Sequence, residues 1–486
     1  MSTEQPNSDL EIFEQTAIDA LARLRMHIEA ASHGETPASG YAAMTEILDS
    51  LGVRQWIAHG GMDRSAFDRF LERYLRHSVQ LHHPAHIAHQ VSVPDYPAAL
   101  AALINGVTNN PMAIYEMGPA AAAIEFAIIN WMLEKIGWPP QPMPGVACDR
   151  HAAGVLTHGG SLANLTALLA ARARVAPDAW EKGTPGDLAV LIPQASHYSI
   201  GRAVSILGLG SYAAYHLEVD ELGVIRPDRL QIALDRVNSD GRRCMALVAS
   251  ACSTATGLHD RLQAIGEFCN ANGIWFHADA CHGATALLGS RSKHYLAGIE
   301  LADSVVWDAH KMMQVPVICA AVLLKDGIDF EHAFHTEASY LAHGEDEDSF
   351  DSIQRTVECT KAALGLKIFL NLAWRGEAAL GAYVDDRYEA TKCFYELIRS
   401  RPGFECPYEP ESNILCFRYD VDDARLVTIR SELMREGRFH ITSAMVNGRR
   451  FLRLTVMNKL TDVSTVEALL DAIEEKAAAC AHFRDD

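Results

Sequence analysis

His310 and Lys311 form a polar pair between two apolar stretches of the chain. The first stretch, 304–307, is typical of a strand inside a sheet, and the second covers 315–324. Burial between such stretches would lower the pKa of the lysine ammonium group and leave a free amine, which is a nucleophile toward a carbonyl carbon. Most lysines are solvated surface charges, so other motifs must support this chemistry.

A glycine-rich turn with a small hydroxyl side chain precedes a predicted helix at 162–175. The turn reads Thr-His-Gly-Gly-Ser at 157–161 and includes Gly160 and Ser161. The free N–H groups and the dipole of a helix N-terminus favour an anion, so this turn could hold a phosphate group. A plain glycine turn with a serine cap is the alternative interpretation.

Two further polar side chains stand at the ends of apolar strands. His197 follows 188–192 and could stack on a flat heteroaromatic ligand, although an incidental histidine beside a capping serine fits as well. Asp279 ends 274–278, and a carboxylate among apolar residues needs a cationic partner, for which a protonated pyridine nitrogen would serve. No second carboxylate lies close to it in sequence to share a divalent metal ion.

These motifs occur in the chain at successive strand ends of one predicted sheet. They supply a phosphate turn, a stacking imidazole, a carboxylate for a pyridine nitrogen and an amine for a Schiff base. A pyridoxal 5′-phosphate enzyme requires these parts together. The sequence therefore predicts that Asp279 keeps the ring nitrogen protonated and that Lys311 carries the cofactor.

The elements that must position these residues alternate between strand and helix. This alternation predicts an α/β fold, with a mostly parallel central sheet and helices on both of its faces. Right-handed crossovers then bring the carboxyl ends of the strands to one edge. The predicted strands are 188–192, 245–249, 274–278, 304–307 and 318–324, and the helices between them are 162–175, 200–207, 227–237 and 262–270.

Three regions are expected along the chain. Residues 1–90 have amphipathic helical patterns and predict a helical N-terminal segment. Residues 91–380 predict the large cofactor-binding domain, and 381–486, with long helices beside short strands, predict a smaller α+β domain.

Composition excludes several classes of protein. The chain has 486 residues, 49% of them hydrophobic, and a net charge of −20, which argues against a nucleic-acid or anionic-membrane surface. No uncharged apolar run of 18 residues is present, and the polar N-terminus lacks the pattern of a signal peptide. Eleven cysteines without a C-x-x-C pair favour reduced thiols in a cytoplasmic protein.

With these motifs, the chain resembles the group II pyridoxal-phosphate amino-acid decarboxylases, which include glutamate, cysteine-sulfinate, 2,4-diaminobutyrate and aromatic amino-acid decarboxylases. The resemblance extends from about residue 80 to the C-terminus. It is most specific at 159–164, 196–201, 277–283 and 307–316. It implies a fold-type I homodimer with active sites at the subunit interface.

The resemblance also implies roles for single residues. Thr254 would lie near the phenolic oxygen of the cofactor, Cys281 would contact the ring face, and His310 would reach the phosphate. Lys311 would be the Schiff-base lysine. The full set of cofactor-contacting residues would be Gly160, Ser161, His197, Thr254, Asp279, Cys281, His310 and Lys311.

The substrate side follows from the same resemblance. Arg453 would bind the α-carboxylate bidentately, although an arginine in an alternating strand can also face solvent. His89 and Gln90 would wall the substrate pocket. Tyr340, in a polar lid at 334–350, would return a proton to the carbanion, with His197 or water as the alternative donor.

The expected reaction is decarboxylation of a small polar amino acid to the amine and carbon dioxide, because 109–116 resembles the glutamate, cysteine-sulfinate and diaminobutyrate branches. Whether the substrate side chain is acidic or amino stays open. Another pyridoxal-phosphate reaction on the same fold, by an aldehyde-forming oxidative deaminase, a transaminase or a lyase, is the alternative. A cofactor-binding regulatory or scaffold protein without turnover is a third hypothesis.

Two departures from the family pattern affect the site. Asp308 and Ala309 stand before the His-Lys pair, where relatives often carry Asn-Pro. Lys361 stands where relatives usually carry an arginine, and a pairing between Lys361 and Asp308 would offset the extra negative charge near the phosphate. Whether the two side chains pair is left open by the sequence.

A metal site is not expected. His82, His83, His86 and His89 lie close together in sequence. However, Pro84 interrupts the helix that would place them on one face, and neither a cysteine nor a carboxylate accompanies them.

Overall fold

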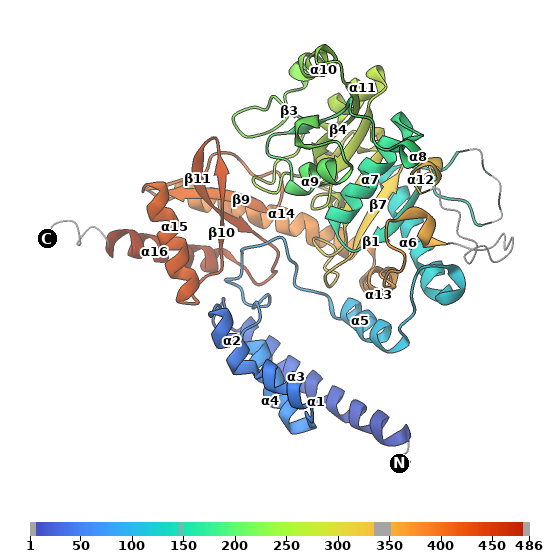
Figure 1. Cartoon of the computed structure of the whole chain (residues 1–486). Coiled ribbons are helices and arrows are strands. Elements are labelled where there is room, and N and C mark those ends of the chain that lie inside the picture. Colours follow the sequence, from blue (N-terminus) through green and yellow to red (C-terminus); the bar gives the residue numbers. More distant parts are fainter. Residues whose placement is uncertain (1–5, 145, 147, 149, 335–350, 480–486) are drawn as a thin grey trace.

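The computed structural model describes residues 6–144, 146, 148, 150–334 and 351–479. Its first four helices form a segment that projects from the rest of the chain (Figure 1). The guanidinium of Arg23 on the first helix pairs with Asp68 on the fourth at 2.5 Å, and Asp63 caps the fourth helix by accepting from the N–H of Ala66. These helices are α1 (Pro6–Ser32), α2 (Met44–Leu51), α3 (Val53–His59) and α4 (Arg64–Arg76).

A seven-stranded sheet in the order β1-β7-β6-β5-β4-β2-β3 forms the centre of the chain. The fold class predicted from the strand–helix alternation is confirmed. The predicted strand at 318–324 is β7, which runs antiparallel to both of its neighbours, whereas the other strands point one way. The strands are β1 (Ala153–Thr157), β2 (Leu188–Pro193), β3 (Ala214–Leu217), β4 (Arg243–Ser250), β5 (Trp275–Asp279), β6 (Ser304–Asp308) and β7 (Ala320–Leu324).

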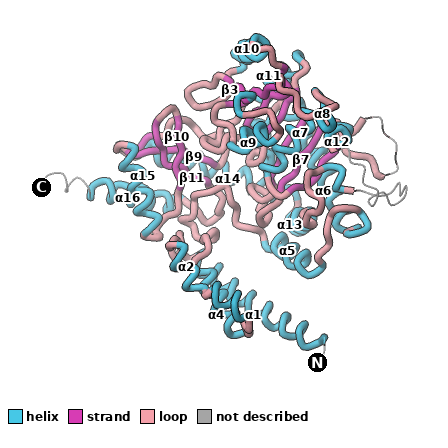
Figure 2. The backbone as a smooth tube through the Cα atoms, viewed as in Figure 1, coloured by secondary structure: helices cyan, strands magenta, loops and turns pink. Residues whose placement is uncertain are grey.

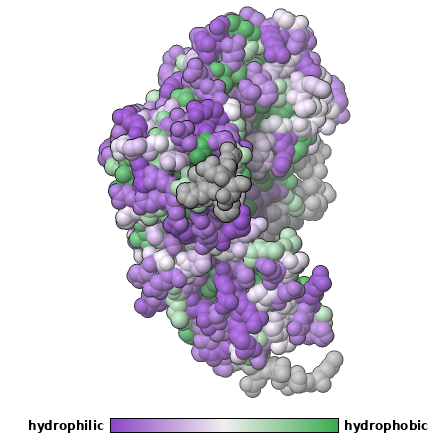
Figure 3. Space-filling model, turned by 90° about the vertical axis from the view of Figure 1, so that its left-hand side faces the viewer, coloured by the Kyte–Doolittle hydropathy of each residue, from purple (hydrophilic) through white to green (hydrophobic). Residues whose placement is uncertain are grey.

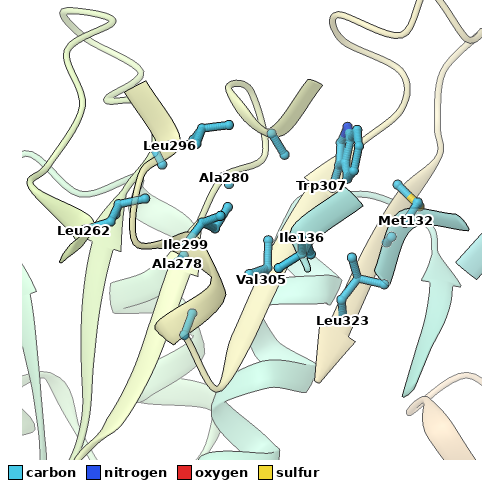
Figure 4. Close-up of a cluster of buried hydrophobic side chains, with 14 of the residues drawn as sticks. Met132, Ile136, Leu262, Ala278, Ala280, Leu296, Ile299, Val305, Trp307 and Leu323 are labelled. Atoms are coloured by element: carbon cyan, nitrogen blue, oxygen red, sulfur yellow. The ribbon is translucent and has the colours of Figure 1, made fainter. Parts of the chain in front are cut away.

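Helices cover both faces of this sheet (Figure 2). On β6, Val305 and Trp307 belong to a core shared with Met132 of α6, whereas Val306 faces the other core with Ala167 of α7. Figure 4 shows the first of these cores. Because both faces are buried, the central strands are almost entirely apolar. The helices are α5 (Tyr96–Thr108), α6 (Pro119–Ile136), α7 (Gly160–Val175), α8 (Ala179–Lys182), α9 (Tyr198–Ile206), α10 (Leu230–Ser239), α11 (Leu262–Asn272), α12 (Ile328–Ala333) and α13 (Gly365–Arg375).

The C-terminal part is built on a four-stranded antiparallel sheet in the order β10-β11-β9-β8. The face of the molecule on this side is mainly hydrophilic (Figure 3). Ala85 and Ile87 pack into the core of this part, and a β-bridge joins His86 to His440, so this short stretch lies with the C-terminal sheet. The elements are α14 (Glu377–Ser400), β8 (Phe404–Glu405), β9 (Ile414–Tyr419), α15 (Asp423–Arg435), β10 (Thr442–Val446), β11 (Arg449–Thr455) and α16 (Val463–Ala479).

Among the described residues, no helix is long and apolar enough to cross a membrane. No group of three or more histidine, cysteine, aspartate or glutamate side chains in the same part of the chain is arranged to hold a metal ion.

Candidate active site

A cavity of about 290 Å³ opens at the carboxyl edge of the central sheet. The loops and helices that follow β1, β2, β4, β5 and β6 line it, as expected for strands that point one way. All the predicted cofactor-contacting residues meet there. These are Gly160, Ser161, His197, Thr254, Asp279, Cys281, His310 and Lys311.

Lys311 is mostly buried, and its Nζ lies 3.0 Å from Oδ2 of Asp308. Burial alone would lower the pKa of Lys311, but the nearby acidic groups, Asp308 foremost, raise it above its usual value. The expectation that burial leaves a free amine is therefore wrong for this chain. The carboxylate of Asp308, which ends β6 three residues earlier, favours the ammonium form of the lysine.

Lys361 does not pair with Asp308, a contact that the sequence left open. Its Nζ lies 2.6 Å and 2.5 Å from the two carboxylate oxygens of Glu125, and both side chains are fully buried. Glu125 also accepts from the N–H of Leu156 on β1 at 3.0 Å. Glu125 therefore joins α6 both to the loop that carries Lys361 and to β1, the strand that leads into the glycine turn.

The glycine turn leaves no room for a side chain at Gly160, the first residue of α7. A Cβ atom there would lie 2.5 Å from Sγ of Cys281 and 3.0 Å from both carboxylate oxygens of Asp308. Gly159 precedes it with a φ of +103°, a conformation that L side chains rarely adopt. The N-terminal turn of α7 is thus open toward the cavity, where its dipole favours an anion.

Asp279 is buried and ionised. Its Oδ2 accepts from Nδ2 of Asn164 at 3.1 Å, and its Oδ1 accepts from the N–H of Cys281 at 3.3 Å. Burial alone would raise the pKa of Asp279, but hydrogen bonding by Cys281 and the nearby basic groups lower it below its usual value. The site therefore presents a buried carboxylate that can accept one more donor.

His197 caps α9, because its Nδ1 accepts from the N–H of Ser199. Burial lowers the pKa of His197, so the ring is neutral at neutral pH. His310 is fixed differently: its Nδ1 donates to the carbonyl oxygen of Cys319 at 2.8 Å. Its Nε2 lies 3.8 Å from Oδ2 of Asp308.

These groups fit pyridoxal 5′-phosphate. The open turn at Gly160 suits its phosphate, and the ionised Asp279 suits a protonated pyridine nitrogen. The neutral imidazole of His197 suits the flat ring, and the amine of Lys311 suits the aldehyde. All four features face one cavity.

The predicted substrate residues lie outside the lining of that cavity. Arg453 is buried, and its Nη1 donates to the carbonyl of Ala88 and to Oγ1 of Thr442, both at 3.3 Å. Its Nε and Nη2 have no partner among the described residues, and neither has Nε2 of Gln90. His89 is exposed, and its ring centroid lies 5.4 Å from that of His440. Tyr340 falls outside the described residues.

Two residues of the site were missed from the sequence. Asn164 ends the stretch 159–164, where the family resemblance is specific, but no role was predicted for it, although it lies about one helical turn after Ser161 on α7. His277 stands two residues before Asp279 on β5, so its side chain shares a face with the carboxylate. The spacing in the helix and in the strand could have indicated both.

Comparison with known proteins gives consistent matches over most of the chain. The model of the family described as "Pyridoxal-dependent decarboxylase conserved domain" matches residues 64–420. The L-2,4-diaminobutyrate decarboxylase of Rhizobium meliloti (strain 1021) is 30% identical over 412 residues, which cover 83% of this chain and 80% of that protein. The acidic amino acid decarboxylase GADL1 of Mus musculus is 27% identical over 418 residues, which cover 82% and 74%.

A solved structure shows the same fold. Mouse CSAD in its apo form has a TM-score of 0.86 to this chain and is 24% identical in sequence. The match covers 96% of this chain and 98% of that one. The N-terminal helices, the central sheet and the C-terminal sheet thus have counterparts in one known structure.

Proposed function

The chain belongs to the pyridoxal-dependent decarboxylase family, and we propose that it converts a small polar L-amino acid to the amine and carbon dioxide, with Lys311 as the Schiff-base lysine. Pyridoxal-phosphate-dependent amino-acid decarboxylation is the activity that this family and the curated relatives share. The observation that carries the proposal for this chain is the meeting of Lys311, Asp279 and His197 around one cavity.

The bound cofactor supplies an electron sink for the pair of electrons left at Cα when the carboxylate departs. Asp279 would accept a hydrogen bond from the ring nitrogen and, as an ionised group, would favour its protonated form. His197 would stack on the ring, and the α7 turn at Gly160 and Ser161 would receive the phosphate. The remaining contacts would come from Thr254, Cys281 and His310.

Arg453 is proposed to orient the substrate. Its Nε and Nη2, which have no partner among the described residues, could form a bidentate contact with the α-carboxylate, and the burial of the side chain would exclude water from that contact. Tyr340 is proposed to return the proton to Cα, and His197 is the alternative donor.

The surroundings of Arg453 favour an acidic substrate side chain over an amino one. His89 is exposed at its surface side, but partial burial of its ring lowers its pKa, and the positive charges of Arg453 and then Arg430 lower it further. The pKa of His440 is lowered to about 4 by burial, with His89 and Arg430 contributing. The positive charges of Arg453 and Arg430 would attract a carboxylate or sulfinate group of the substrate and repel an ammonium group.

We propose a homodimer in the cytoplasm. The projecting helix α1 exposes Leu10, Ile12 and Phe13, and a second copy of the chain would cover such apolar side chains. The cysteines in the described part of the chain are free thiols, which suits a reducing compartment.

A panel of amino acids scored for carbon dioxide release tests the function, with wild type and Lys311→Ala compared. Acidic, sulfinate and diamino substrates should be included. We expect carbon dioxide and amine without ammonia or peroxide, and no covalent cofactor on Lys311→Ala after borohydride reduction and mass spectrometry. Release of ammonia or peroxide would favour the oxidative alternative, and no product from any amino acid would contradict a decarboxylase.

A further inference from the structure

Asn164 connects the two side chains that are proposed to hold the cofactor ring. Its Nδ2 lies 3.1 Å from Oδ2 of Asp279 and 3.0 Å from Oγ of Ser199. Oγ of Ser199 lies 2.7 Å from Nδ1 of His197. The amide group of Asn164 therefore contacts the carboxylate of Asp279 directly and the imidazole of His197 through the hydroxyl of Ser199.

The ionised carboxylate of Asp279 determines which way this amide points. A carboxylate can only accept, so Asn164 must present its NH₂ group to it. The amide oxygen then faces His277, and Nε2 of that ring lies 2.9 Å away. Nε2 must carry the proton, because the amide oxygen can only accept.

A buried chain of hydrogen bonds continues beyond His277, and each further group donates toward that ring. Burial lowers the pKa of His277 to about 4, so the ring is neutral and its Nδ1 is an acceptor. Oγ of Ser304 lies 2.8 Å from that Nδ1 and donates to it. The Nε1–H of Trp275, which can only donate, forms a hydrogen bond to Oγ of Ser304 at 2.7 Å.

The donors and acceptors between Asn164, Ser199 and His197 also match in direction. The second N–H of the Asn164 amide donates to Oγ of Ser199, whose own proton is then free for Nδ1 of His197. The backbone N–H of Ser199 also points to that Nδ1, at 3.3 Å. Nδ1 of His197 is therefore an acceptor, and its proton lies on Nε2.

The interior of this chain of bonds is shielded from water, whereas His197 at its end is half-buried. Trp275, Ser304, His277, Asn164 and Ser199 are each at most 2% exposed. Buried donors and acceptors are expensive to leave unpaired, so reversing one member would disturb all the others.

We propose that Asn164 is a positioning residue, which holds Asp279 as an acceptor for the cofactor ring nitrogen and holds His197 in the tautomer protonated on Nε2. The inference rests on the proposed function for the identity of the ring nitrogen. The amide orientation and the two tautomers are properties of the chain itself.

Nitrogen-15 NMR of the full chain with labelled histidine tests the tautomers without any cofactor. The ring signals of His197 and His277 are assigned by their loss in His197→Gln and His277→Gln. We expect an unprotonated Nδ1 and a protonated Nε2 in both rings at neutral pH. A proton on Nδ1 of either ring would overturn the inference, whatever reaction the protein catalyses.

A binding comparison tests the effect on Asp279. The ligands are pyridoxal 5′-phosphate and an analogue in which C–H replaces the ring nitrogen. We expect wild type to bind the natural cofactor more tightly than the analogue. Asn164→Leu should reduce this ratio of affinities by about tenfold, since the hydrogen bond from Asn164 to the charged carboxylate of Asp279 is lost. Equal weakening of both ligands would show a purely structural role and contradict the proposal.

Two control variants sharpen this comparison. Ser199→Ala cuts the imidazole branch alone and should keep the ligand preference. Thr166→Val changes a fully buried residue of the same helix outside the chain of bonds and should alter neither the preference nor the tautomers. If neither ligand binds wild type, the proposed function fails, while the NMR result still decides the orientation.

Discussion

Nζ of Lys311 lies 3.0 Å from Oδ2 of Asp308, three residues earlier in the chain. Oδ1 of the same carboxylate has no hydrogen-bond partner among the described residues. Asp308 is the main anion that raises the pKa of Lys311 and favours its charged form. In the proposed role as the Schiff-base lysine, Lys311 would have to lose this proton before it could bond to the cofactor.

Asp308→Asn should let Lys311 bond to the cofactor at lower pH. The carboxylate raises the pKa of Lys311, so its removal leaves burial as the dominant influence and lowers that pKa. We expect the pH profile of covalent attachment, followed by absorbance and borohydride trapping, to shift down by about one unit or more. Asp326→Asn, which removes a partner of the exposed Arg150, is the control and should leave the profile unchanged.

Gly160→Ala should weaken cofactor binding by about tenfold or more, because the added Cβ would overlap Sγ of Cys281 and crowd Asp308. Gly201→Ala is the matched control. Gly201 lies inside α9, and none of the described residues outside its own turn comes within 4 Å of an added Cβ, so this change should leave binding unaltered and stabilise the helix by about 0.5–1 kcal/mol. Equal cofactor affinity in the two variants would contradict the steric argument.

The fold could be predicted from the sequence further than the site could. The apolar runs of β2, β4, β5 and β6 indicate a sheet buried on both faces, and the ends of those strands indicate where a ligand binds. The reversed direction of β7 could not be predicted, because an apolar run has the same composition in either direction. The charge state of Lys311 depends on a 3.0 Å contact that spacing alone does not give.

Ion pairs between residues far apart in the chain also could not be predicted from the sequence. Glu125 and Lys361 are 236 residues apart, and each alone reads as an ordinary charged residue in a helix or a loop. Their pairing follows from the packing of α6 against α13 and the loop that precedes it. Asn164 and His277, by contrast, lie on the predicted faces of a helix and a strand, and only their shared hydrogen bond required the structure.

Glu125→Gln should destabilise the protein strongly, because it leaves the ammonium of Lys361 buried without its anion. Breaking a buried ion pair typically costs about 3–5 kcal/mol. We expect a clear fall in the thermal unfolding midpoint, and partial recovery in the double variant Glu125→Gln with Lys361→Met. Removing Glu377 from its exposed pair with Lys135 should cost about 1 kcal/mol or less. A midpoint for Glu125→Gln no lower than that of the Glu377 variant would contradict the prediction.

Acid should destabilise the protein through its buried histidines. Burial lowers the pKa of His86 to about 3 and that of His282 to about 3. Their neutral forms stabilise the folded state fully above about pH 6.5, and this contribution falls by about 1.4 kcal/mol per pH unit for each ring as the pH decreases toward 3. In His86→Gln, unfolding at pH 5 should take up about one proton fewer, measured from the pH dependence of the unfolding free energy. An unchanged slope would show that His86 is already protonated in the folded state.

Arg430→Gln should separate an acidic substrate from an amino one. The charge of Arg430 acts on His89 and His440, beside the proposed carboxylate site at Arg453. Its loss should raise KM for an acidic or sulfinate amino acid by about tenfold with little change in kcat, since the charge is proposed to act on binding. KM for a diamino substrate should stay equal or fall, because an ammonium group is then repelled less. Arg435→Gln, on the exposed end of the same helix, is the control. If Arg430→Gln instead raises KM for the diamino substrate, the positive charges of Arg430 and Arg453 do not select the substrate side chain.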